Sequence, residues 1–568
     1  MDHESTFHDQ IWFGPIDRPL CGWLHGPLED GARGGILLAP PLGREAFGAR
    51  HALDALAKAL ARRGFVVLRF DYDGTGDSSG HLNDPARDRA WVDSVMEGIG
   101  LLSSMGLTSI SGVGLRLGAT LLGVAAAERD AQFTSLVLWD PCESGRSYLR
   151  ELSALEGLRR ESYEANPDGS VETSEFVFLS QAASEIRSLS LIAGSEPFAE
   201  RTLVITRSDR SIPIKLGTRL ADAKVEWETT SEHGAMFDVE YFRSAVPYET
   251  VARITEWLSD APASHDTFLR PQRTSSAVVA GENGVGRVSE RSLQIGSRKV
   301  FAIVSEPDGE ARGPWIVLMN SAGDDHTGRA RTWVELSRRW ASLGLRSVRF
   351  DLSGYGESPE SEGRQHRVMF DRAWLDDLND VVQEVSPDDP SNCVFVGLCS
   401  AAHVAVEGAL TLRASGVCAI NPPAALDLLH SAALSARSRR AALRALSAPM
   451  KRLVTRHQWV AASLSQVLER LPTNYFVDSL STLIKGGTNV LVLDCEEDLT
   501  PQPRTPFFRS IDVLRVGKKR KYEVEMVPGA DHALNNAAGR VRVMAILDAH
   551  ILGQFAGSAQ ANTPPDSP

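Results

Sequence analysis

Cysteine, long apolar runs and positive charge are all scarce in this sequence. The chain of 568 residues contains six cysteines, none of them in a C-x-x-C pair, which argues against a zinc site or a disulfide framework. No segment offers about 18 uninterrupted apolar residues, so we expect no membrane span. The first residues also lack a basic start followed by an apolar run. Free thiols and a cytoplasmic location are therefore expected.

Acidic residues outnumber basic ones. The 73 Asp and Glu residues against 60 Lys and Arg residues give a formal net charge of −13, which disfavours a role on nucleic acid or on an anionic membrane. Glycines cluster in GTGDSSG and GYGESPES, but these turns lack the G-x-G-x-x-G spacing of a dinucleotide site. We therefore expect no nucleic-acid partner, no cofactor and no metal.

The chain contains the same α/β pattern twice, once in each half. RGGILLAPPLG, ALDALAKALARRGF and VVLRFDYDGTGDSSG in the first half correspond to GPWIVLMNSAG, TWVELSRRWASLGL and RSVRFDLSGYGESPES in the second. The correspondence continues in order, with SLVLWDP matching GVCAINPP. Strands that alternate with amphipathic helices predict a mostly parallel sheet covered on both faces. The expected fold class is therefore α/β, in two tandem copies.

Composition sets the expected boundaries. We predict a first domain over residues 1–260, a linker rich in Ala, Ser, Gly and Pro over 261–285, a second domain over 286–556 and a disordered tail over 557–568. Each domain has a lid insertion, and in the second the segment from Leu428 to Leu468 has arginines but no Asp or Glu. This segment either steers an anionic substrate or forms a solvated face against the acidic first domain.

The turn GLCSA, residues 397–401, stands between a predicted strand and a predicted helix. Small residues around Cys399 allow a cramped turn that holds the thiol over the edge of the sheet. The backbone N–H of Ser400 would then point to where an oxyanion forms. A second oxyanion donor is expected from Ser321 or Ala322, in the loop after the first parallel strand.

With these motifs, both halves resemble the α/β-hydrolase fold, in which nucleophile, acid and histidine follow in this order. The local sequences also resemble bacterial hydrolases associated with exosortase systems and serine-aminopeptidase-like hydrolases. The resemblance implies a catalytic triad of Cys399, Asp498 and His532, in which the imidazole activates the thiol and the acid orients the ring. Asp494 and Glu497 are competitors for the role of the acid.

The first half keeps the turn and loses the nucleophile. The apex of GLRLG, residues 114–118, is Arg116, which stays protonated and cannot accept an acyl group. Asp209 and His233 remain at the positions of the acid and the histidine, and we align Asp498 with Asp209. We expect a non-catalytic site in which Arg116 pairs with Asp209 or with the carbonyl ends of the sheet. In the alternative, Arg116 binds a carboxylate or a phosphate.

The expected function is hydrolysis of an ester, thioester or lactone through an acyl-enzyme on Cys399. A thiolate is a good nucleophile and a good leaving group, which also suits transfer of the acyl group to another acceptor. An acyltransferase is therefore one alternative, and a non-enzymatic scaffold with two relic sites is another. The expected partner is a small acyl substrate, anionic if the basic segment faces it. The sequence makes no prediction of the oligomeric state.

Overall fold

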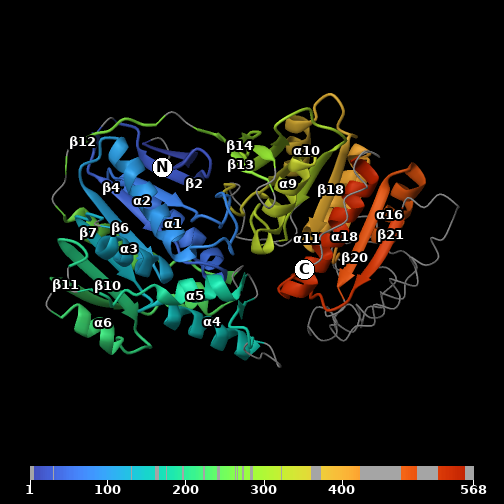
Figure 1. The fold of residues 1–568 in the computed structure, drawn as a ribbon. Coiled ribbons are helices and arrows are strands. Elements are labelled where there is room, and N and C mark those ends of the chain that lie inside the picture. The colour runs from blue at the N-terminus through green and yellow to red at the C-terminus, as the bar shows by residue number, and fades with distance from the viewer. Residues whose placement is uncertain are drawn as a thin grey trace, which may run out of the picture.

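The protein is described by a computed structural model. It describes residues 5–29, 31–129, 131–159, 166–173, 176–194, 197–221, 224–239, 243–261, 264, 266–271, 274–281, 286–321, 323–359, 373–422, 475–495 and 522–556. The first and second halves of the chain form two lobes that lie side by side (Figure 1). Each lobe is built on one large β-sheet.

The first sheet has eight strands in the order β1-β2-β5-β4-β6-β7-β10-β11. The pairs β1–β2 and β2–β5 are antiparallel, and the remaining pairs are parallel. The strands are β1 Thr6–Phe13, β2 Leu20–Pro27, β4 Gly35–Ala39, β5 Val66–Phe70, β6 Ile110–Leu115, β7 Ser135–Trp139, β10 Arg201–Arg207 and β11 Val225–Thr230.

The second sheet has nine strands in the order β13-β14-β15-β17-β16-β18-β19-β20-β21. Its pairs are antiparallel from β13 to β17 and parallel from there on. The strands are β13 Ser276–Ala280, β14 Arg287–Ile295, β15 Val300–Pro307, β16 Trp315–Met319, β17 Arg346–Phe350, β18 Cys393–Leu398, β19 Gly416–Ile420, β20 Asn489–Cys495 and β21 Tyr522–Val527.

Apart from β13, the second sheet repeats the strand order of the first. The register is repeated as well: Ile36 of β4 pairs with Val67, and Ile316 of β16, at the same spacing along the chain, pairs with Ser347. The predicted α/β class is confirmed by these mixed sheets and their helices, and the same order of elements recurs in both halves.

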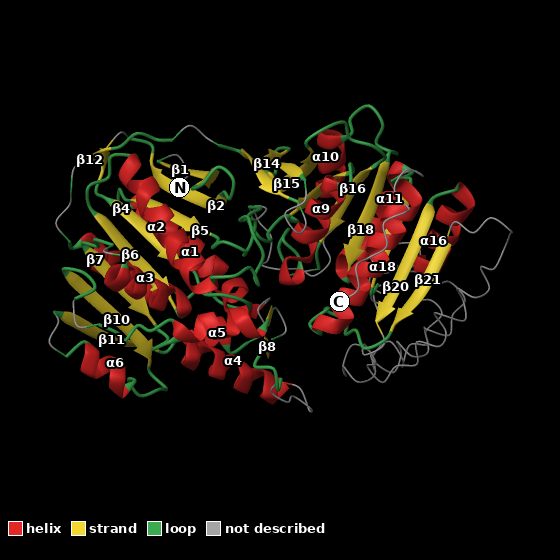
Figure 2. Ribbon diagram, in the orientation of Figure 1, coloured by secondary structure: helices red, strands yellow, loops and turns green. Residues whose placement is uncertain are grey.

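Helices cover both faces of each sheet (Figure 2). In the first half α1 and α8 share one core with the sheet, and α2, α3 and α5 share the other. In the second half α9 and α18 lie on one face, and α10, α11 and α16 on the other. The helices are α1 Arg44–Arg62, α2 Arg87–Ser104, α3 Leu117–Glu128, α4 Gly145–Arg159, α5 Ser180–Ser188, α6 Ile214–Arg219, α7 His233–Phe237, α8 Tyr248–Ser259, the 3₁₀ turn η3 Arg329–Arg331, α9 Thr332–Ser342, α10 Ala373–Val385, α11 Ser400–Leu412, α16 Tyr475–Gly486 and α18 Ala537–Phe555.

The central strands are apolar along their whole length because helices cover both of their faces. Every residue of β4, GILLA, and of β16, WIVLM, is buried. The helix α9 turns Trp333, Leu336 and Trp340 toward this core at spacings of three and four residues, which is the period of an amphipathic helix. The two cores of each half hold the sheet rigid beneath the turns at its carboxyl edge.

The segment predicted to be a linker, residues 261–285, is described in part. Within it, β12 Asp266–Thr267 pairs with β3 Gly31–Ala32, and β13 forms the edge of the second sheet. The backbone N–H of Trp12 also donates to the carbonyl of Thr274. The connecting chain therefore contacts both halves, and the domain boundaries themselves stay a prediction. The tail, residues 557–568, lies outside the described residues.

The insertion ahead of β10 in the first half contains α4, α5 and a short hairpin. The hairpin pairs β8 Val171–Glu172 with β9 Val177–Phe178. In the corresponding insertion of the second half α16 is described, whereas residues 423–474, which include the basic segment 428–468, lie outside the described residues. Across the described part of the chain, none of the helices has both the length and the apolar character needed to cross a membrane.

Candidate active site

Cys399 stands at the turn between β18 and α11, and Arg116 stands at the same turn between β6 and α3. The backbone of Cys399 has φ 54° and ψ −117°, and that of Arg116 has φ 56° and ψ −118°. A positive φ is strained for residues other than glycine and persists only where the surroundings enforce it. The surroundings of Cys399 enforce it, because the chain packs so closely at this turn that a Cβ on Gly397 would lie 2.2 Å from the carbonyl oxygen of Ala401. Both turns therefore have the geometry of a nucleophile elbow.

The imidazole of His532 reaches the thiol of Cys399. His532 follows β21, and its Nε2 lies 3.0 Å from the Sγ of Cys399, within the reach that proton transfer requires. Cys399 is partly exposed, whereas the other five cysteines are buried. The structure thus brings together two of the three residues of the predicted triad.

Asn421 fixes the backbone on which His532 is carried. It follows β19, is fully buried, and its Nδ2 donates to the carbonyl oxygen of His532 over 2.8 Å. Its Oδ1 accepts from the backbone N–H of Cys495, also over 2.8 Å. The sequence analysis missed this residue, although the alignment of AINPP with LWDP sets it opposite Asp140.

The third member of the triad and part of the oxyanion site fall outside the described residues, which exclude Asp498 and Ala322. Ser400 is buried and opens α11. The Oγ of Ser321 donates to Asp324 over 2.8 Å. The preceding residue, Asn320, is buried, and its side-chain amide has no hydrogen-bond partner among the described residues. An unpaired buried amide is costly, so it needs an explanation such as a catalytic role.

The strand ladder revises our alignment of the acids. The backbone N–H of Asp140 donates to Ile205, and the backbone N–H of Asn421 donates to Leu493, which makes Ile205 and Leu493 equivalent. Asp209 is four residues beyond Ile205, and Glu497 is four residues beyond Leu493. By this count the sequence counterpart of Asp209 is Glu497, one residue before Asp498.

Arg116 is neutralised by carboxylates that its turn faces. Its Nε donates to Glu45 over 2.8 Å, its Nη1 to Asp140 over 3.1 Å and its Nη2 to Glu151 over 2.6 Å. The expected pairing with Asp209 is wrong, but Nη1 also lies 3.4 Å from the backbone carbonyl of Asp140, at the end of β7. All three guanidinium nitrogens are engaged, which disfavours the alternative of a bound carboxylate or phosphate.

The other two residues of the first-half site are not arranged for catalysis. Asp209 is paired with Arg207, and its side chain is 62% exposed. His233 directs Nε2 to Asp140 over 3.1 Å. Burial, together with the positive charges of Arg116 and Arg207, lowers the pKa of His233 to about 3. Such a weakly basic imidazole is a poor proton acceptor near neutral pH.

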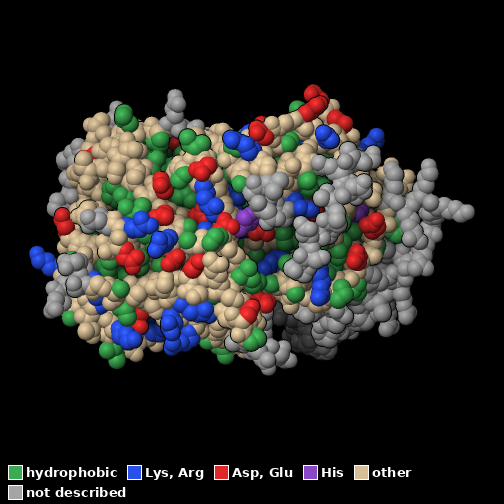
Figure 3. Space-filling model, in the orientation of Figure 1, with side chains coloured by type: hydrophobic (Ala, Val, Ile, Leu, Met, Phe, Trp, Pro, Cys, Tyr) green, Lys and Arg blue, Asp and Glu red, His purple; other side chains and the backbone are tan. Residues whose placement is uncertain are grey.

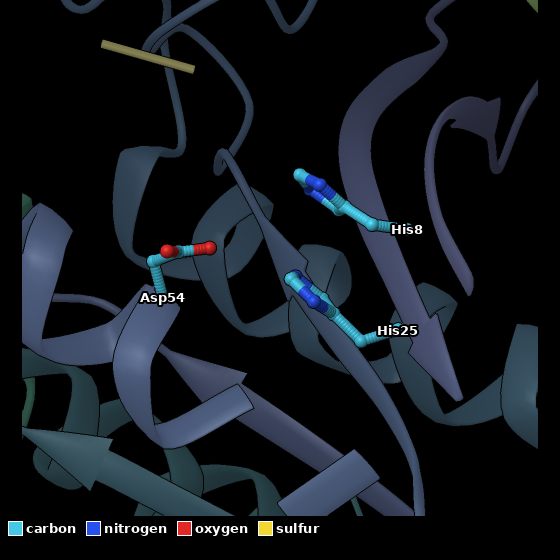
Figure 4. A group of neighbouring side chains, drawn as sticks. All are labelled: His8, His25 and Asp54. Carbon is cyan, nitrogen blue, oxygen red and sulfur yellow. The ribbon is translucent and has the colours of Figure 1, made fainter. Parts of the chain in front are cut away.

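A pair of histidines lies on the first sheet, close to an acidic residue of α1. The rings of His8 and His25 stack 4.3 Å apart and face the carboxylate of Asp54 (Figure 4). Arg69 donates to the Nε2 of His25 over 3.1 Å, and Lys58 and Arg69 bind the two oxygens of Asp54. These cations occupy electron pairs that a metal ion would need. The cluster is therefore better described as the edge of a network of ion pairs.

The second half of the chain is similar to α/β hydrolases. Residues 316–543 match the family described as the alpha/beta hydrolase family, and this match supports a hydrolase enzyme. No curated protein matches the chain. The narrower resemblance to exosortase-associated hydrolases stays a prediction.

Several solved structures are similar to part of the chain. Est1E from Butyrivibrio proteoclasticus with bound ferulic acid is 14% identical, with a TM-score of 0.34, over 44% of this chain and 97% of its own. The Pyrococcus furiosus esterase Pf2001 is 13% identical, with a TM-score of 0.30, over 48% and 93%. XC6422 from Xanthomonas campestris, an α/β serine hydrolase without a lid, is 14% identical, with a TM-score of 0.29, over 51% and 100%.

Proposed function

We propose that the protein is an acyl hydrolase of the α/β-hydrolase type, with its active site in the second half and Cys399 as nucleophile. The observation that carries this proposal is the contact of 3.0 Å between the Sγ of Cys399 and the Nε2 of His532, at a strained elbow. The substrate class is an ester, thioester or lactone. The first half, with Arg116 at its elbow, is a non-catalytic copy of the same fold.

The reaction proceeds through a thioester on the enzyme. His532 takes the proton of the Cys399 thiol, and the sulfur attacks the acyl carbon. The N–H of Ser400 stabilises the oxyanion that forms. The bond from the acyl carbon to the leaving oxygen or sulfur then breaks, and His532 returns the proton to the leaving group. A water molecule, deprotonated by His532, attacks the acyl carbon, which releases the acid and restores the thiol.

A sulfur nucleophile also supports the second candidate, an acyltransferase. The acyl group on Cys399 is a thioester, and thioesters react readily with amines and thiols because the thiolate is a good leaving group. In that case an alcohol, an amine or a thiol replaces water in the second step. The same enzyme-bound thioester serves both reactions.

Selective alkylation tests the proposed nucleophile. We expect iodoacetamide to label Cys399 rapidly, because it is the exposed thiol beside an imidazole, and to label the five buried cysteines slowly. The rate constant for Cys399 should drop in His532→Ala, and peptide mass spectrometry measures it. A slow, unactivated rate in the unmodified protein would remove both the hydrolase and the acyltransferase, leaving a scaffold.

Aryl esters and acyl-coenzyme A then separate hydrolysis from transfer. A burst of leaving group, equal in amount to the enzyme and absent in Cys399→Ala, is expected for an acyl-enzyme. The steady rate after the burst is measured with and without an added alcohol or amine. A rate that rises with the acceptor, with formation of the new ester or amide, identifies a transferase, and an unchanged rate identifies a hydrolase.

A further inference from the structure

The loop after β16, residues 320–331, differs from its counterpart in the first half. In the first half the chain enters the helix α1 at Arg44, soon after β4 ends at Ala39. In the second half the corresponding helix, α9, begins only at Thr332, well after β16 ends at Met319. We call residues 320–331 the β16 loop. It contains Asn320 and Ser321, and β16 places it beside the elbow because Met319 pairs with Gly397.

The β16 loop is bound by the first half of the chain. His326 is fully buried, and its Nε2 lies 2.6 Å from Asp77, in the glycine-rich turn after β5. Asp325 forms an ion pair with Arg50 of α1. Arg331 donates to the backbone carbonyls of Gly76, Ser78 and Gly80 over 2.8 to 2.9 Å. Side chains of both charges gather where the two lobes meet on the face shown in Figure 3.

The second half binds the same loop from its other side. The backbone N–H of His326 donates to Asp351 over 2.6 Å, and its Nδ1 lies 2.8 Å from the same carboxylate. Within the loop, Asp324 accepts from Ser321 and pairs with Arg329 over 3.1 Å. Polar contacts therefore bind the loop to both halves at His326, and Asp324, two residues before it, binds Ser321 in the part of the loop that follows β16.

We propose that the first half of the chain holds the β16 loop in the conformation that acylation of Cys399 requires, with Asp77 and Arg50 as positioning residues. This inference rests on the proposed function. Apart from the 3₁₀ turn η3 at its end, the described part of the loop is not helical. Turn hydrogen bonds such as that from the N–H of Gly328 to Asp325 fix it less firmly than the helical hydrogen bonds of α1 fix the counterpart. Its conformation depends on Asp77 and Arg50, which belong to the first half of the chain. The non-catalytic half thus contributes to the reaction of the other half by positioning the β16 loop.

The variants Asp77→Asn and Arg50→Met test this task in the full chain. Asp77→Asn keeps a side chain of the same size but removes the charge that faces His326. Displacement of a positioned group by about 1 Å costs on the order of 100-fold in rate, so we expect the acylation rate constant from the aryl-ester burst to fall by about 100-fold. The rate of Cys399 alkylation by iodoacetamide, which needs no oxyanion donor, should stay unchanged.

The matched control is Arg69→Met, which breaks another ion pair of the same junction while Glu357 keeps its ion pair with Arg50 over 3.2 Å. Arg69 is buried and pairs with Glu357 over 2.9 Å. This variant should keep both rate constants, and thermal denaturation checks that all variants are folded. Should Asp77→Asn fail to fold, Arg50→Met carries the test, because its side chain is 20% exposed.

Two outcomes would overturn the inference alone, given a wild-type chain that acylates. One is an unchanged acylation rate in Asp77→Asn and Arg50→Met. The other is an equal loss in Arg69→Met, which would show general damage to the junction. Failure of the proposed function looks different, because the wild-type chain itself would then show no burst with any ester.

Discussion

At the scale of single residues, the two elbows show how one turn can carry opposite chemistry. Cys399 meets an imidazole, whereas Arg116 meets the carboxylates of Glu45, Asp140 and Glu151. Burial raises the pKa of Glu45 and of Asp140, so both acids depend on the guanidinium to stay ionised. Arg116 therefore stabilises the acidic side chains around the first elbow.

Replacement of Arg116 by methionine should destabilise the first half. Arg116→Met leaves three carboxylates without their shared cation, and breaking a buried ion pair in this way costs about 3–5 kcal/mol. Urea denaturation followed by tryptophan fluorescence measures the loss. The rate of Cys399 alkylation should not change. A stability equal to that of the wild type would mean that the three acids take up protons without cost.

The contacts of single side chains were the features least predictable from the sequence. Cys399 and His532 were predicted because the order of motifs in a duplicated fold identifies them. The partners of Arg116 come from α1, the end of β7 and α4, and nothing in their local sequence links them. Asn421 was missed for the same reason, since its side-chain hydrogen bonds join segments that lie far apart in the chain.

At the scale of elements, Asn421 joins three pieces of the candidate site: the end of β19, the end of β20 and the loop that carries His532. Asn421→Ala removes the side-chain hydrogen bonds to the N–H of Cys495 and to the carbonyls of Asp531 and His532, at a cost of about 1–3 kcal/mol. The loop with His532 is then free to move away from Cys399. We expect a lower acylation rate and slower alkylation of Cys399.

The matched variant is Asn421→Asp, which copies the residue of the first half. A carboxylate accepts from Cys495 as the amide does, but it cannot donate to the carbonyl of His532. We expect it to lose activity as the alanine variant does and to lose at least as much stability, because it buries a carboxylate against the carbonyl oxygen of His532. Full activity in both variants would show that His532 is placed by other contacts. Kinetics and urea denaturation of the same samples measure the two effects.

The elements themselves were largely predictable. Alternation of apolar strands with amphipathic helices indicated two parallel sheets, and small residues around Cys399 indicated the elbow. The conformation of the β16 loop was not predictable. Its sequence has the same length as the corresponding segment of the first half, which includes the start of α1, and the contacts that set its conformation come from the other half. GTGDSSG, which the sequence analysis treated only as a glycine turn, supplies Asp77 to that contact.

At the scale of the whole molecule, the junction of the two halves makes stability depend on pH. His326 lies between Asp77 and Asp351, with Arg349 bound to the other oxygen of Asp77. Burial alone would lower the pKa of His326, but the two carboxylates raise it well above its ordinary value. A raised pKa in the folded state means that the stabilisation is complete below the unfolded value of about 6.5 and is lost as the pH rises.

The free energy of unfolding should therefore fall from about pH 6.5 upward. Asp71, whose pKa burial and the charge of Asp77 raise to about 7, contributes a fall of the same sign at lower pH. In His326→Gln we expect a lower stability near neutral pH and a flatter slope above it. Urea denaturation from about pH 6 to about pH 9 gives both curves. Parallel curves would contradict the assignment.

The ion pairs of the junction are reciprocal. Asp77 of the first half binds Arg349 of the second, and Glu357 of the second, at the equivalent position, binds Arg69 of the first. Such an exchange is the pattern of an interface between two identical subunits related by a twofold axis. Two separate subunits would dissociate on dilution. Covalently joined halves instead have an effective concentration for each other in about the millimolar range. A junction made of buried charges can therefore stay closed however dilute the protein is.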